Sequence, residues 1–205
     1  MSMSIKNQGL YLKEFEHENC GAGFICNLNG DKTNQIIHDA LNILIRLEHR
    51  GGVSSDGKTG DGAGLLIDIP HDFFTRACSF KLPKPREYAV GMIFLPQNPN
   101  QYQLCKDVLK EELSNKGLEI LGWRKVPVNS EKLGEIASKS EPKIEQIFIK
   151  KSNNDSEIVF KSKLYASRKI SENRIIDSKI SQSSYFYISS LSITTLIYKG
   201  ILKPE

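Results

Sequence analysis

The sequence predicts an α+β fold with enough chain to bury a core of its own. Segments with strand composition and segments with helical periodicity mix along 205 residues, and no internal repeat separates them. Hydrophobic residues make up 39% of the chain and charged residues 25%, which is typical of a soluble globular protein. No apolar run is long enough to cross a bilayer, so we expect no membrane partner.

The first quarter of the chain is predicted to hold a leader, a strand and a helix. Residues 1–19 are polar and show no clear period, whereas residues 20–28 have strand character and end at an Asn-Gly turn. Thr33 or Asn34 can cap a helix over 36–50, which the following Gly-Gly pair would terminate. Its apolar residues recur three and four positions apart, at Ile37, Ala40, Leu41, Leu44 and Leu47.

Residues 51–64 (GGVSSDGKTGDGAG) form an unusual segment, with glycine at six of fourteen positions and aspartate at two. Such a composition excludes a helix or a regular strand. The segment follows a helix and precedes a predicted strand at 65–69, which is the reverse of the order in a dinucleotide-binding fingerprint. An aspartate inside the loop would also repel phosphate. We therefore expect no phosphate cradle here.

The rest of the chain alternates between strands and helices. Pro70 begins a short helix, and the chain closes with a pair of strands over 185–200. Between them the pattern predicts strands at 88–96, 118–128 and 144–150, helices at 101–117 and 155–179, and a helical or loop segment after residue 128.

The charge distribution raises the question of a nucleic-acid partner. Residues 1–80 hold 7 Lys/Arg and 10 Asp/Glu, whereas residues 81–205 hold 21 and 14. In the basic part, lysines are interleaved with glutamates, as on a solvated helix face, and no nucleic-acid motif occurs. We therefore predict no nucleic-acid partner.

The four cysteines are Cys20, Cys26, Cys78 and Cys105. No C-x-x-C spacing or accompanying His/Cys cluster is present, so a zinc site is not expected. The amino-terminal stretch lacks the apolar region of a secretory signal. We expect a cytoplasmic protein with reduced thiols.

Cys20 is flanked by small residues, with glycine at 21 and 23, which would let another group approach its sulfur. A thiol nucleophile needs a base, and none of the four histidines, His17, His38, His49 and His71, is clearly placed to serve. If residues 1–19 were removed, the α-amine of Cys20, with a pKa of about 7.7–8.0, could act as that base. From residue chemistry alone, a buried structural cysteine remains the favoured interpretation.

His49 and Arg50 stand at the predicted helix exit. An arginine held there could offer its planar fork of donors to a ligand. The alternative is that both side chains satisfy the last helix carbonyls, and for His49 this alternative is favoured.

The ordered motifs N-C-G-A-G-F, L-x-x-L-x-H-R-G-G and D-G-K-T-G-D-G-A-G-L-L resemble those of the amino-terminal glutamine amidotransferase domain of glutamate synthase large subunits. The later stretches Y-A-V-G-M-I-F-L-P, L-G-W-R-x-V-P-V, P-K-I-E-Q-I-F-I and S-L-S-x-x-T-x-I-Y-K-G-I-L follow in the same order. The resemblance runs from about Glu14 to Lys199.

The resemblance implies a four-layer αββα sandwich of the N-terminal-nucleophile hydrolase type, here incomplete. Residues 1–19 would be a cleaved leader, and residues 20–205 the amino-terminal portion of the amidotransferase domain. Cys20 would attack the side-chain amide of glutamine and form a thioester. Arg50 would help position the nucleophile end of the pocket. Gly51 and the 59–64 loop, which contributes Gly60, Asp61 and Gly62, would shape the wall beside it.

The family also implies partners and cofactors beyond this chain. The ammonia would reach 2-oxoglutarate at a second site in the remainder of the large subunit, which uses FMN and an iron–sulfur cluster, and no cofactor is expected in these residues. In the family, an H-x-R-F-S-T-N-T stretch holds the substrate carboxylate and an H-N-G-E stretch builds the oxyanion hole, and neither occurs here. A second hypothesis is therefore a non-catalytic fragment or binding module that keeps the fold.

Overall fold

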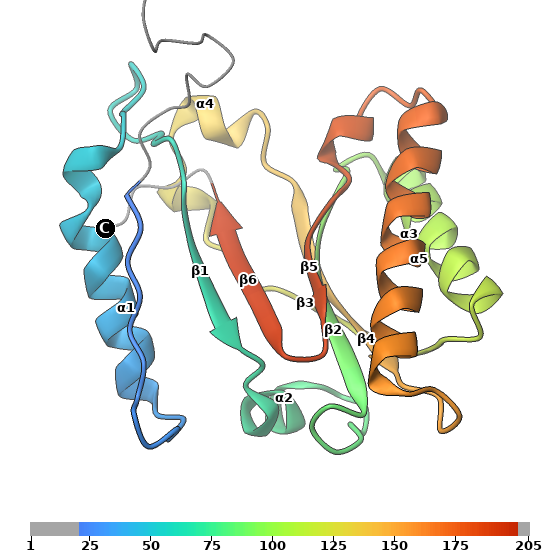
Figure 1. Ribbon diagram of the computed structural model, residues 1–205. Helices are drawn as coiled ribbons and strands as arrows, with labels where there is room; N and C mark the ends of the chain where they lie inside the picture. The colour runs from blue at the N-terminus through green and yellow to red at the C-terminus, as the bar shows by residue number, and fades with distance from the viewer. Residues whose placement is uncertain (1–20, 201–205) are drawn as a thin grey trace, which may run out of the picture.

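The computed structural model describes residues 21–200, which form two antiparallel β-sheets and several helices (Figure 1). The larger sheet has the strand order β3-β4-β2-β5, and the smaller sheet pairs β1 with β6. The strands are β1 (Ala63–Asp68), β2 (Tyr88–Leu95), β3 (Glu119–Lys125), β4 (Lys143–Lys150), β5 (Tyr187–Ser192) and β6 (Thr195–Gly200). The predicted α+β class is confirmed.

Strand β2 lies at the centre of the larger sheet, and every one of its residues is buried. Because successive side chains of a strand point to opposite faces, β2 contributes to two separate apolar clusters. Ala89, Ile93 and Leu95 belong to the first cluster, and Val90 and Met92 belong to the second. A strand buried on both faces reads as a continuous apolar run, which is the pattern of 88–96 in the sequence.

The first cluster packs the larger sheet against helices α3 (Pro99–Asn115) and α5 (Glu157–Asp177). Both helices begin at the capping residues that their sequences supply. The Asn98 side chain accepts hydrogen bonds from the backbone N–H groups of residues 100 and 101, and the Ser156 hydroxyl accepts one from Val159 at 3.3 Å. Gly117, with φ at 69°, follows α3 in the left-handed region that glycine adopts readily.

The second cluster lies on the opposite face of the larger sheet, where helix α2 (His71–Ala77) and the β1–β6 pair cover it. Phe148 stands among the rings of Phe74, Phe80 and Tyr88, at centroid distances of 5.0, 5.2 and 6.3 Å. Leu196 of β6 joins this cluster and is fully buried. The second cluster therefore joins the two sheets.

Helix α1 (Asn34–Arg46) lies against the β1–β6 pair, on the side away from the larger sheet (Figure 1). None of its residues is buried, and Leu41 and Ile45 are more than two-fifths exposed. An ion pair between Lys32 and Asp68 joins the start of the helix to the end of β1. Figure 1 shows, in order, α1, the β1–β6 pair, the larger sheet and the α3–α5 pair.

The shorter helices lie in the connections. Three single turns occur at Glu48–Arg50, Ser130–Lys132 and Ser183–Tyr185, and helix α4 (Glu135–Ser138) precedes β4. Within the described residues, no helix is long and apolar enough to span a membrane.

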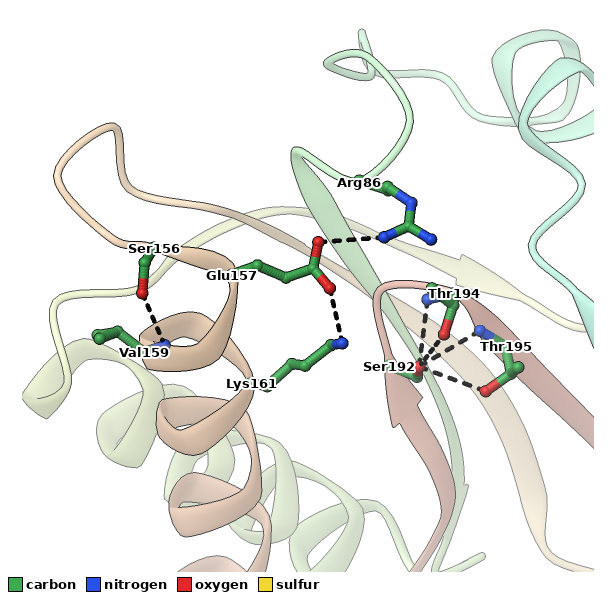
Figure 2. Close-up of polar contacts among 8 residues, drawn as sticks. All are labelled: Arg86, Ser156, Glu157, Val159, Lys161, Ser192, Thr194 and Thr195. Carbon is green, nitrogen blue, oxygen red and sulfur yellow. Dashed lines mark hydrogen bonds and ion pairs between the residues drawn. The ribbon is translucent and has the colours of Figure 1, made fainter.

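A serine-centred turn passes the chain from the larger sheet to the smaller one. Figure 2 shows the Ser192 hydroxyl at the end of β5, accepting hydrogen bonds from the backbone N–H groups of Thr194 and Thr195 at 3.2 and 3.3 Å. The same figure shows Glu157, in the first turn of α5, between Arg86 and Lys161. At the Ser192 turn the chain leaves β5 in the larger sheet and enters β6 in the smaller one.

Three sequence expectations differ from the structure. Residues 21–28 form no strand, because they run along α1 and pair with no strand of the described chain. The strands within 185–200 do not pair with each other; β5 pairs with β2, and β6 pairs with β1. The helix expected over 36–50 ends at Arg46, and the chain continues into the turn Glu48–Arg50.

Candidate active site

The exit of α1 places Arg50 on a short turn that ends at glycine. The N–H of Arg50 donates to the carbonyl of Leu47 at 2.9 Å, and the N–H of Gly51 donates to the carbonyl of Glu48 at 2.9 Å. Arg50 is exposed, and its guanidinium makes no hydrogen bond to another residue of the described chain. The side chain is therefore presented outward from a fixed backbone.

The histidines of the described chain are engaged with neighbours on their own elements or in the core. His49 Nδ1 lies 3.0 Å from the carbonyl oxygen of Arg46, which confirms the structural interpretation of this residue. His71 Nδ1 lies 3.0 Å from Tyr88 Oη, and His38 Nε2 lies 3.1 Å from Asn34 Nδ2. His49 stands at the α1 exit, but its Nδ1 contacts the last helix carbonyl.

The glycine-rich segment folds back on itself as a short hairpin. Backbone hydrogen bonds join Asp61 N to the carbonyl of Gly52 at 3.2 Å and Ser54 N to the carbonyl of Thr59 at 2.8 Å, on either side of a bridge between Val53 and Gly60. The hairpin explains how a segment so rich in glycine keeps a defined shape. It also places residues 60–62 directly beside the residues that follow Arg50.

Asp61 fixes the base of this hairpin. Its Oδ2 accepts a hydrogen bond from the N–H of Gly52 at 2.5 Å. A Cβ atom on Gly52 would lie 2.9 Å from that oxygen, closer than real Cβ atoms come, so a larger residue at this position would shift the Asp61 carboxylate. A Cβ on Gly51 would meet only the Glu48 carbonyl oxygen, at 3.5 Å. Gly62 has φ at 115°, in the region that favours glycine.

Asp56 and Thr59 hold the tip of the hairpin to helix α4. Asp56 Oδ1 accepts from the N–H of Thr59 at 2.8 Å, and Asp56 Oδ2 accepts from Thr59 Oγ1 at 2.6 Å and from the N–H of Ile136 at 3.1 Å. Thr59 Oγ1 in turn accepts from the N–H of Ala137 at 3.3 Å. The hydrogen bonds from the Thr59 side chain and backbone hold the pKa of the Asp56 carboxyl well below its usual range.

The described chain begins next to this exit. A Cβ on Gly21 would lie 3.4 Å from Arg50 Cβ and 3.1 Å from Leu47 Cδ2, and a Cβ on Gly23 would lie 2.5 Å from Ile43 Cγ2. Residues 21–23 therefore run closely along α1, with Gly21 at the Arg50 end. Cys20, the predicted nucleophile, and the predicted leader 1–19 lie outside the described residues.

Two of the other cysteines, Cys78 and Cys105, have environments unlike that of a thiol nucleophile. Burial raises the pKa of the Cys105 thiol to about 12. Burial also raises the pKa of Cys78, and the nearby charge of Arg124 partly opposes this rise. Cys26 is exposed, and these three thiols form no disulfide with one another. Within residues 21–200, no three His, Cys, Asp or Glu side chains gather where they could hold a metal ion.

The geometry thus brings together three segments of the sequence: the residue after Cys20, the end of α1 with Arg50, and the Gly60–Gly62 stretch. The sequence model of the class II glutamine amidotransferases matches residues 20–205. The chain belongs to this family.

Individual relatives point to one kind of protein. The chain is 42% identical over 202 residues to the large chain of glutamate synthase [NADPH] from Bacillus subtilis, a match that covers 98% of this chain and 13% of that protein. It is 38% identical over 210 residues to glutamate synthase [NADH] from Saccharomyces cerevisiae, covering 96% of this chain and 10% of the relative.

A plant relative has a similar match. Ferredoxin-dependent glutamate synthase 1 from Arabidopsis thaliana is 39% identical over 189 residues, which covers 91% of this chain and 12% of the relative. The chain therefore corresponds to the glutamine amidotransferase domain of glutamate synthases and spans only about an eighth of the length of these relatives.

The structure adds residues to the candidate site that sequence reasoning did not select. Gly52 is the glycine whose N–H binds the Asp61 carboxylate, whereas the sequence pointed to Gly51. Asp56 and Thr59 were read only as part of a glycine-rich loop. Their three-residue spacing is one at which an aspartate side chain caps a turn, and that signal could have found them.

Proposed function

We propose that this domain is a glutaminase that uses Cys20 as its amino-terminal nucleophile after residues 1–19 are removed, and that it releases ammonia for glutamate synthesis. The observation that carries the proposal is the convergence at the α1 exit, where Gly21 packs beside Arg50 and Asp61 binds Gly52. The start of the family match at residue 20 supports the same boundary.

In the proposed reaction, the free α-amine of Cys20 takes the thiol proton, and the thiolate attacks the side-chain amide carbon of glutamine. The resulting tetrahedral intermediate collapses to a thioester, and the protonated amine gives its proton to the departing ammonia. Water then attacks the thioester carbonyl, loses a proton to the amine and releases glutamate, which restores the thiol. No external oxidant or reductant takes part.

Arg50 has the position to act on this centre, because it lies beside Gly21, the residue that follows Cys20 in the sequence. The guanidinium would position the nucleophile end of the pocket by hydrogen bonding. Gly51, Gly60, Asp61 and Gly62 would form the wall beside it, with the Asp61–Gly52 hydrogen bond fixing the relative placement of the two segments.

Residues 21–200 offer no evident site for the electron-transfer cofactors of the whole enzyme. An iron–sulfur cluster needs several thiolates, and no group of three candidate ligands gathers within residues 21–200. A flavin phosphate needs free backbone N–H groups, but in the glycine loop the Asp61 and Asp56 carboxylates already occupy the N–H groups of Gly52 and Thr59. We assign FMN and the cluster to the remainder of the large subunit, which would be this domain's partner.

The arrangement of α1, the two sheets and the α3–α5 pair supports a four-layer αββα sandwich as the architecture of this domain. In that architecture the second cluster is the interface between the two sheets, and the candidate site lies where α1 ends and β1 begins.

The proposal is tested by reacting the full chain with a diazo-ketone analogue of glutamine and measuring the rate at which Cys20 is modified. Arg50→Ala should slow this modification by at least ~10-fold, because a misplaced reacting group typically costs up to ~10²-fold. Arg46→Ala, four residues earlier at the end of α1, serves as the control and should react like the unmodified chain.

Glutamine hydrolysis provides the second measurement. Cys20→Ala should abolish any release of glutamate from glutamine, since it removes the thiol that forms the thioester in the proposed reaction. Hydrolysis that survives in Cys20→Ala, or equal labelling rates for the two arginine variants, would overturn the assignment.

A further inference from the structure

The tip of the glycine hairpin is tied to helix α4, which comes from a part of the chain far away in sequence. The hydrogen bond from the Ile136 N–H to Asp56 Oδ2 joins residues that are 80 positions apart. That from the Ala137 N–H to Thr59 Oγ1 joins residues that are 78 apart. Helix α4 therefore begins on the Asp56 and Thr59 side chains, because its own N-cap, Gly134, offers no side chain to cap it.

The contact is closely fitted. Thr59 is only 4% exposed, although it belongs to a loop whose other residues are mostly exposed. A Cβ atom on Gly134 would lie 2.5 Å from Thr59 Oγ1 and still closer to Asp56 Oδ2. Any side chain at position 134 would therefore push the Asp56 carboxylate and the Thr59 hydroxyl away from the α4 backbone.

The residues held by this contact lead directly into the candidate site. Thr59 is followed by Gly60 and Asp61. Hydrogen bonds across the hairpin join Thr59 to Ser54 and Asp61 to Gly52, so the placement of one strand of the hairpin determines that of the other. The base of the hairpin adjoins Arg50 through Gly51 and Gly52. Glycine-rich backbone has many accessible conformations, so a defined wall needs an anchor at its tip as well as at its base.

We infer that Asp56 and Thr59 are positioning residues that set the glycine wall of the amidotransferase pocket by anchoring the hairpin tip to α4. They touch no reacting atom and act through Gly60, Asp61 and Gly62. This inference rests on the proposed function for its effect on catalysis, but the anchoring itself is a property of the folded chain.

The test uses Thr59→Val and Thr59→Ser in the full chain. Valine keeps the shape of threonine but removes the hydroxyl that accepts from Ala137 and donates to Asp56, whereas serine retains it. Thr59→Val should accelerate amide hydrogen exchange at residues 52 and 60–62 by at least ~10-fold, and Thr59→Ser should restore slow exchange. Exchange of the buried β2 amides should change much less, which shows that each variant is folded.

Gly134→Ala tests the same anchor from the α4 side, without altering the hairpin sequence. It should increase exchange at residues 60–62, as Thr59→Val does, and Asp56→Ala should act in the same direction. Asp107→Asn, which changes an exposed carboxylate on α3, is the control and should leave hairpin exchange unchanged.

The effect of the anchor on the candidate site is measured by the rates at which two reagents modify Cys20. Thr59→Val should slow modification of Cys20 by the diazo-ketone glutamine analogue by ~10–100-fold, because the pocket wall is displaced. Modification by iodoacetamide, which needs no glutamine pocket, should be unchanged. A general loss of structure would alter both rates.

The outcomes separate the two claims. If the unmodified chain does not react with the glutamine analogue, the proposed function fails, and hydrogen exchange still decides whether the anchor exists. If that chain reacts but Thr59→Val and Gly134→Ala leave both the hairpin exchange and the analogue rate unchanged, the inference is wrong and the proposed function stands. Slower analogue modification without faster hairpin exchange would also overturn it.

Discussion

Leu196 offers a direct measure of the packing between the two sheets. Its side chain is fully buried in the second cluster, on the face of β6 that meets the larger sheet. Truncating a fully buried leucine to alanine loses the transfer free energy of the removed groups and leaves a cavity, which together cost about 2–5 kcal/mol. Since Leu196 is 0% exposed, we expect Leu196→Ala to lower the free energy of unfolding by about 3 kcal/mol.

Leu66 provides a matched control on the other strand of the same sheet. It is 61% exposed and lies opposite Ile197 in the β1–β6 pairing. Because most of its surface already contacts water, Leu66→Ala should cost under about 1 kcal/mol. Both variants keep the strand pairing itself, so the difference between them isolates the burial of one leucine between the sheets.

The assay is urea denaturation followed by circular dichroism, with thermal unfolding as a second measure. A loss of about 3 kcal/mol should lower the melting temperature by about 6–12 °C in a chain of this size. The same cost for Leu196→Ala and Leu66→Ala, or a cost below about 1 kcal/mol for Leu196→Ala, would refute the packing of β6 onto the larger sheet. The position of the candidate site relative to that sheet would then be wrong as well.

Three further predictions concern the first cluster and the thiols. Lys106→Ala should lower the free energy of unfolding by about 3 kcal/mol, because the Glu145 carboxylate, which is 4% exposed, loses its ammonium partner at 2.7 Å. An unchanged urea midpoint would contradict this prediction. Ser171→Ala should be neutral or stabilising by about 1 kcal/mol, since the buried Ser171 hydroxyl has no hydrogen-bond partner among residues 21–200. A clear loss of stability would show that it has one. At pH 9 the Cys105 thiol should resist alkylation in the native protein, because burial raises its pKa to about 12, while the exposed Cys26 is modified; rapid labelling of Cys105 before unfolding would refute its burial.

Much of the fold could be predicted because strong local patterns coincide with the elements. The continuous apolar run of β2 and the helical periodicity of α3 both act within a few residues. Both elements lie within two residues of the expected ranges, 88–96 and 101–117. Residues 21–28 have strand composition too, but a strand requires a hydrogen-bonding partner, and composition does not reveal whether one exists. Composition likewise does not reveal which partners β5 and β6 pair with, and the two strands, joined through the Ser192 turn, belong to different sheets.

Only part of the candidate site could be predicted from the sequence, for a related reason. Family motifs pointed to Arg50 and Asp61, whose segments do meet at the α1 exit. The close approach of Gly52 to the Asp61 carboxylate is a single contact, which sequence spacing does not disclose. The anchoring of Asp56 to Ile136 joins positions 80 residues apart and has no local signature on the α4 side.

The central claim is that Cys20 becomes an amino-terminal nucleophile that recognises glutamine. The most direct measurement is the intact mass of the full chain before and after reaction with the diazo-ketone glutamine analogue, followed by peptide mapping of the adduct. We predict loss of residues 1–19 and a single adduct on Cys20, which an excess of glutamine suppresses. An uncut leader together with an unlabelled Cys20, or an adduct that glutamine does not suppress, would contradict the claim.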